Sequence, residues 1–193
     1  MTGDQAIQRL LSGNRRYLHA KQEHPNQTPE RRGELQGGQR PFAVILGCSD
    51  SRVPPEVIFD HGLGDLFVVR VAGNVVDKIV LGSIEYAVSH LETPLIMVLA
   101  HADCGAVTAA LSGCDESQGQ LHSITSAIQP AIYQVKDGPG DILNKASKAN
   151  AKIIAERLKN SKPFLFEAVK AGKLKIVAAY YDLYTGVVEI LSQ

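Results

Sequence analysis

Two short polar segments contain residue types that bind metal ions: CSDSR (residues 48–52) and HADCG (residues 101–105). Zinc prefers thiolate and imidazole ligands in a tetrahedral arrangement, and Cys48, His101 and Cys104 could supply three of them. His101 and Cys104 are three residues apart, so one helical turn would place both side chains on the same side. Three protein ligands leave one position for water or an acid, which is typical of a catalytic zinc site rather than a structural one.

Asp50 and Arg52 lie close enough in the sequence to act on the same site. Asp50 is two residues from Cys48, so in extended chain the two side chains point the same way. The carboxylate could occupy the fourth zinc position, or it could pair with Arg52, whose guanidinium binds a carboxylate through two hydrogen bonds. The sequence leaves both arrangements open, and it also leaves open a purely structural ion pair.

The elements that position these segments follow from the pattern of apolar residues. Strands are predicted at residues 42–47, 65–71, 95–100 and 174–180, with a last strand at 187–191 after a turn at 185–186. Helices are predicted at residues 4–20, 79–91, 106–111, 123–136, 147–158 and 164–171, with a short helix near 30–36. Apolar strands alternating with helices predict an α/β fold, in which helices flank a mainly parallel central sheet of four strands plus an antiparallel edge strand.

This predicted fold brings the two polar segments together. The segment 48–52 follows the first strand and the segment 101–105 follows the third, and these strands could be neighbours in the sheet. Ligands of open parallel sheets bind beyond the carboxyl ends of the strands. We therefore expect the metal site at this edge.

Length and composition indicate one globular domain. The 193 residues fit a single domain over 1–193, with an N-terminal helical arm (1–38) and an α/β core (39–193). Twenty basic residues balance twenty acidic ones, which gives no sign of a nucleic-acid or membrane-surface partner. An odd number of cysteines argues against a disulfide framework, and we interpret Cys114 as an incidental thiol.

The expected location is the cytoplasm. No secretory signal and no apolar run near the roughly 20 residues of a membrane span is found. A periplasmic or organellar location is the alternative if a leader has been removed.

Several blocks of the sequence, in order, resemble the β-class carbonic anhydrases over nearly the whole chain. CSDSRVPPE (48–56) and HADCGAV (101–107) resemble the two zinc motifs of that family. Further blocks that resemble it are VVRVAGN (68–74), GSIEYAV (82–88) and GKLKIVAAYYDLYTGVV (172–188). The resemblance implies reversible hydration of carbon dioxide to bicarbonate and a proton, with one Zn²⁺ per chain. It assigns Cys48, His101 and Cys104 as zinc ligands, Asp50 as a switchable fourth group, and the Asp50–Arg52 pair as catalytic.

The resemblance also implies a substrate pocket and self-association. Gln39 matches a glutamine that helps to hold substrate, and Gly105 offers an amide to it. Phe67 and Tyr86 match aromatic positions that line an apolar pocket at a subunit interface, and Ala72 stands at a third pocket position. A homodimer or homotetramer is implied, with the N-terminal helix packed on the partner chain.

Two other functions would use the same residues. One is a zinc hydrolase of carbon disulfide or carbonyl sulfide, which would differ in access to the pocket. The other is a catalytically silent zinc-binding regulatory protein, which would be expected to lack Asp50 or Arg52, whereas both are present. A structural zinc site would require four permanent ligands.

Overall fold

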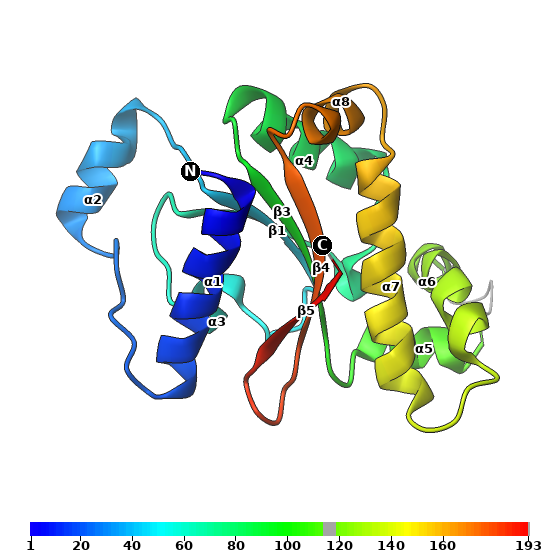
Figure 1. The fold of residues 1–193 in the computed structure, drawn as a ribbon. Coiled ribbons are helices and arrows are strands. Elements are labelled where there is room, and N and C mark those ends of the chain that lie inside the picture. Colours follow the sequence, from blue (N-terminus) through cyan, green and yellow to red (C-terminus); the bar gives the residue numbers. More distant parts are fainter. Residues whose placement is uncertain (114–118, 193) are drawn as a thin grey trace.

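The computed structural model describes residues 1–113 and 119–192, and its centre is a five-stranded sheet in the order β2-β1-β3-β4-β5 (Figure 1). β2, β1, β3 and β4 run parallel, and β5 pairs antiparallel with β4 at one edge. The strands are β1 (Ala43–Gly47), β2 (Leu66–Arg70), β3 (Leu95–His101), β4 (Lys175–Tyr181) and β5 (Val188–Ser192). The predicted α/β fold with its antiparallel edge strand is confirmed.

Helices cover both faces of the sheet. Helix α1, with α3 beside it, packs on one face, whereas α4, α7 and α8 pack on the other (Figure 1). α5 and α6 pack against each other and against α7. The helices are α1 (Gly3–Leu18), α2 (Pro29–Glu34), α3 (Pro55–Ile58), α4 (Lys78–His90), α5 (Gly105–Leu111), α6 (Leu121–Val135), α7 (Ile142–Lys159) and α8 (Phe164–Lys170), with 3-10 turns η1 (Leu35–Gly37) and η2 (Ala72–Asn74).

The strands are apolar throughout because both faces are buried. Ile45 of β1 belongs to the core cluster that includes residues of α1, and the next residue, Leu46, belongs to the cluster that includes residues of α4 and α7. Neither side chain is exposed to solvent. Such strands read as continuous apolar runs rather than as alternating patterns.

Two elements differ from the sequence-based expectation. Helix α3 was not predicted, because a single turn of four residues is too short to show helical periodicity. Helix α7 begins at Ile142 and not at residue 147, since the Asp141 side chain accepts a hydrogen bond from the Asn144 backbone N–H and caps the additional turn. Cys114 lies outside the described residues.

The N-terminal 38 residues have two parts. Helix α1 buries Ala6, Ile7 and Leu10 against the sheet of its own chain. Residues 19–38 contain no buried residue, and α2 stands apart from the sheet (Figure 1). Within the described residues, no helix is both long and apolar enough to span a membrane.

A buried carboxylate connects this N-terminal part to the core. Asp65, just before β2, accepts hydrogen bonds from the side chains of Arg9 (2.9 Å) and Asn26 (2.8 Å) and from the Gly62 backbone N–H (3.1 Å). The His61 ring Nδ1 lies 3.7 Å away, too far for a hydrogen bond. Burial raises the pKa of Asp65, but these partners outweigh it and hold that pKa well below its usual range.

Candidate metal centre and active site

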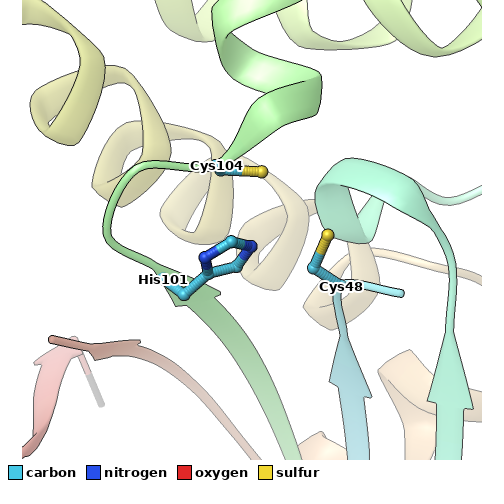
Figure 2. Close-up of side chains that lie close together, drawn as sticks. All are labelled: Cys48, His101 and Cys104. Carbon is cyan, nitrogen blue, oxygen red and sulfur yellow. The ribbon is translucent and has the colours of Figure 1, made fainter. Parts of the chain in front are cut away.

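The three predicted ligands meet at the carboxyl edge of the sheet. Cys48 follows β1, His101 ends β3, and Cys104 precedes α5, and β1 pairs directly with β3. Their ligand atoms all lie within 4.8 Å of one another, and the three side chains are buried. Figure 2 shows the imidazole and the two sulfur atoms directed toward a common space. The predicted grouping of these three residues is confirmed.

The His101 ring has one satisfied nitrogen and one unsatisfied nitrogen. Nδ1 lies 2.8 Å from the Ala102 carbonyl oxygen, which can only accept, so Nδ1 carries the proton. Nε2 is buried and has no hydrogen-bond partner among residues 1–113 and 119–192. A buried polar atom left unpaired is costly, and a neutral imidazole nitrogen with a free lone pair is a metal ligand. The geometry around His101 therefore fits a metal ion at Nε2.

The Cys48 and Cys104 side chains affect each other's pKa. A hydrogen bond from the Cys104 thiol is the largest of the effects that lower the pKa of Cys48 to about 4, against burial, which raises it. The pKa of Cys104 is raised because its proton is held by the Cys48 sulfur and because the group is buried. A divalent cation would allow both groups to ionise. Two thiolates and an imidazole are the donor set that zinc prefers, so the residues present fit that ion.

Asp50 is paired with Arg52 and is not part of the ligand cluster. The Arg52 Nε and Nη2 atoms donate to the two carboxylate oxygens at 2.9 and 2.8 Å, and the Arg52 backbone N–H adds a third hydrogen bond at 2.9 Å. The hydrogen bond from the Arg52 side chain is the main reason that the pKa of Asp50 is lowered to about 2. Of the two arrangements that the sequence left open, this structure has the ion pair. The fourth-ligand role of Asp50 stays a prediction.

Residues that the sequence did not single out hold this pair in place. Arg52 Nη2 also donates to the Asp103 carbonyl oxygen at 3.2 Å. Asp103 has a φ of +49°, and its backbone N–H donates to Asn144 Oδ1 at 3.0 Å. The Tyr184 hydroxyl donates to the Asp103 carboxylate at 2.9 Å. The loop between two candidate ligands is therefore fixed from α7 and from the β4–β5 hairpin.

Arg70 fixes the other ligand loop. Its guanidinium donates to the carbonyl oxygens of Cys48 and Asp50, the first at 2.8 Å. Arg70 ends β2, and its position at the carboxyl end of a strand was a signal that could have identified it from the sequence.

The predicted substrate residues divide into two groups. Ala72, in η2, precedes Gly73, whose backbone N–H donates to Cys48 Sγ at 3.3 Å, and Gly105 follows Cys104. Phe67 pairs with Val44, three residues before the end of β1, so it lies roughly 10 Å back along the sheet. The Phe67 and Tyr86 rings are 6.2 Å apart.

Gln39 is exposed and precedes β1, at the opposite end of that strand from Cys48. The structure thus brings Phe67 and Tyr86 together, but it does not bring Gln39 or Phe67 to the ligand cluster of the same chain.

Comparisons with known proteins show the family to which the chain is similar. A family model described as carbonic anhydrase matches residues 43–188. A protein of Mycolicibacterium smegmatis named carbonic anhydrase is 41% identical over 186 residues, which cover 95% of this chain and 90% of that protein. Carbonic anhydrase 2 of Mycobacterium tuberculosis is 41% identical over 183 residues, covering 92% of this chain and 87% of that protein.

Solved structures of β-carbonic anhydrases are similar to this fold. A tetrameric β-carbonic anhydrase of the ascomycete Sordaria macrospora superposes with a TM-score of 0.78 at 28% identity, and 96% of each chain is covered. A Coccomyxa β-carbonic anhydrase in complex with acetazolamide has a TM-score of 0.76 at 28% identity, covering 82% of this chain and 75% of that chain.

Proposed function

The chain belongs to the β-class carbonic anhydrases, enzymes that interconvert carbon dioxide and bicarbonate, and from this premise we propose that it performs this reaction with one Zn²⁺ per chain. Cys48, His101 and Cys104 would hold the ion. One observation carries the proposal: the buried Nε2 atom of His101 has no hydrogen-bond partner in the part of the chain that the structure describes, and the ligand atoms of His101, Cys48 and Cys104 all lie within 4.8 Å of one another.

Zinc, when bound, would supply Lewis acidity, which lowers the pKa of a coordinated water from 15.7 to about 7. Asp50 orients the attacking oxygen by accepting a hydrogen bond from it. A carboxylate with a pKa of about 2 is ionised at neutral pH and can only accept, which makes the direction of that hydrogen bond unambiguous.

Arg52 has the complementary task of fixing the carboxylate. Its two side-chain hydrogen bonds to Asp50 prevent the carboxylate from rotating. The Gly105 amide would donate to an oxygen of the substrate as negative charge develops there.

We further propose that the pocket is completed by a second copy of the chain. Gln39 and Phe67 lie too far from their own ligand cluster to contact a substrate there. Tyr86 is 46% exposed, and it contacts Phe67 of β2, the strand at the outer edge of the sheet. The Sordaria relative is tetrameric. A homodimer is the smallest assembly in which these residues could reach a partner's site.

The decisive experiment measures zinc content and carbon dioxide hydration by stopped flow at pH 8.5 on the same sample. One zinc per chain and fast turnover that acetazolamide suppresses are expected. Cys104→Ser should lose both, whereas Cys114→Ser, the same change at the cysteine outside the two motifs, should lose neither.

Two results would contradict the proposal. A folded protein that carries no metal would remove zinc from it. Zinc at one per chain without turnover would favour a hydrolase of carbon disulfide or carbonyl sulfide, or a silent zinc-binding protein, and carbon disulfide would separate these two.

A shared pocket can be tested by mixing two impaired variants. Asp50→Asn and Gln39→Ala chains each impair a different half of the site. In a two-fold symmetric dimer, a mixed pair contains one site with both native halves, so unfolding and refolding the mixture together should restore about a quarter of wild-type activity. Activity no higher than the mean of the two separate variants would show that each chain builds its site alone.

A further inference from the structure

A continuous buried path connects helix α7 to the sulfur of Cys48. The Asn150 side chain on α7 is 2% exposed, and its Nδ2 atom donates to the Gly73 carbonyl oxygen at 2.9 Å. The Gly73 backbone N–H in turn donates to Cys48 Sγ at 3.3 Å. We propose that Asn150 is a positioning residue, which through Gly73 sets how strongly the Cys48 sulfur donates charge to the metal. The inference rests on the proposed metal site.

The backbone of Gly73 needs a hydrogen bond from another residue to fix its orientation, because glycine can adopt many backbone dihedral angles. Its φ is +68°, in the left-handed region that glycine adopts without strain. A Cβ atom at this position would lie 2.7 Å from Ile128 Cδ1 and 3.2 Å from Ala106 Cβ. Glycine therefore fits the space, but it leaves the orientation of the flanking peptides free. The hydrogen bond from Asn150 fixes the carbonyl and, through the same residue, the direction of the N–H.

The direction of this N–H matters for the chemistry of the site. A hydrogen bond to a thiolate stabilises charge on sulfur and leaves less of it to share with a metal. The metal is then the stronger Lewis acid. Without the hydrogen bond, Cys48 would donate more charge, and a coordinated water would be less acidic.

Packing alone does not account for an asparagine at this position. Helix α7 already buries Ala151, Ile154 and Leu158 against the sheet, and the Arg157 guanidinium holds the Val76 carbonyl oxygen at 2.9 Å. A buried amide is costly unless its hydrogen bonds are made, and an apolar residue would dock the helix without that cost. The hydrogen bond from the Asn150 amide to the Gly73 carbonyl oxygen explains why a polar side chain occupies this buried position.

The test uses cobalt in place of zinc, because the sulfur-to-cobalt charge-transfer band reports the donor strength of the thiolates directly. Asn150→Leu keeps the size of the side chain and removes the donor. The charge-transfer band should move to longer wavelength. The value of kcat/KM at neutral pH should fall about tenfold, and the pH at the midpoint of the kcat/KM profile should rise.

Ser147→Ala is the matched control. Ser147 lies one turn earlier on α7 and is 2% exposed, and its hydroxyl donates within the helix, to the Leu143 carbonyl oxygen. This variant should keep the wild-type band and pH profile. If Asn150→Leu does not fold, Asn150→Ala removes the same donor with a smaller side chain.

The outcomes are distinct. An unchanged band in a folded Asn150 variant, or an equal shift in Ser147→Ala, would overturn the positioning role. The absence of any sulfur-to-cobalt band in the wild-type protein would instead contradict the metal site itself.

Discussion

The metal cluster and the aromatic pair differ in how far one chain can build them. Cys48, His101 and Cys104 are buried and lie within 4.8 Å of one another, positioned by the pairing of β1 with β3. Phe67 and Tyr86 contact each other at the outer edge of the sheet, partly exposed and away from the cluster. One chain thus brings its three candidate metal ligands together by itself, whereas on our proposal the substrate pocket requires the assembly of two chains.

The largest effect should come from breaking the metal cluster. His101→Ala removes the nitrogen ligand that we propose for zinc, and we expect zinc content near zero and kcat/KM lower by about 1,000-fold or more, since Lewis acidity is worth several kcal/mol. Sedimentation should show an unchanged oligomeric state, because the aromatic pair is intact. His19→Ala, at an exposed position after α1, is the control. Retained zinc in His101→Ala would reject the ligand assignment.

The next largest effect should come from Asp50, where a substitution should lower turnover without loss of zinc. Asp50→Asn should keep one zinc per chain and lower kcat/KM by about 100-fold, because an amide does not hold Arg52 or the attacking oxygen in the same way. Stopped-flow hydration and metal analysis on one sample would show this. Asp137→Asn, at an exposed position between α6 and α7, should change nothing. Wild-type turnover in Asp50→Asn would remove Asp50 from the mechanism.

A third test concerns Asp65, which connects the N-terminal part to the core. A carboxyl group whose pKa is lowered on folding stabilises the protein fully above its unfolded pKa of about 3.9, and the contribution is lost as the pH falls toward the folded pKa. Asp65→Asn should lower the free energy of unfolding at pH 7 by about 2 kcal/mol. Urea denaturation at pH 7 and pH 3 should show the difference shrinking in acid. A difference that stays constant with pH would contradict the role of the charge.

The smallest effect should come from the aromatic pair. Tyr86→Ala should keep zinc, weaken self-association, and lower kcat/KM by about tenfold, which corresponds to about 1.4 kcal/mol. Sedimentation velocity and stopped flow together test this. Tyr133→Ala, at another exposed tyrosine, is the matched control. If Tyr86→Ala lost zinc as well, the two regions would not be separable in the way that we describe.

The fold and the grouping of Cys48, His101 and Cys104 were predictable because both follow from local patterns. Apolar runs gave the strands, and the rule for carboxyl ends of parallel strands placed Cys48 beside His101. Asn150 and Tyr184 were not predictable, because their partners lie 77 and 81 residues away in the sequence. A side chain that acts across such a distance leaves no trace in its neighbours. The single turn of α3 was missed for the opposite reason, since it is too short to form a pattern.

The distance along the chain between the ligands has a consequence for folding. Cys48 and His101 are 53 residues apart and become neighbours only when β1 has paired with β3. Contacts of this kind form late, because a long loop must close first. A chain that has not assembled its sheet presents no high-affinity site, so zinc uptake would follow sheet formation. The fraction of chains that carry zinc would then equal the fraction that has folded correctly. Chelators would compete best for zinc during synthesis, before the site has formed.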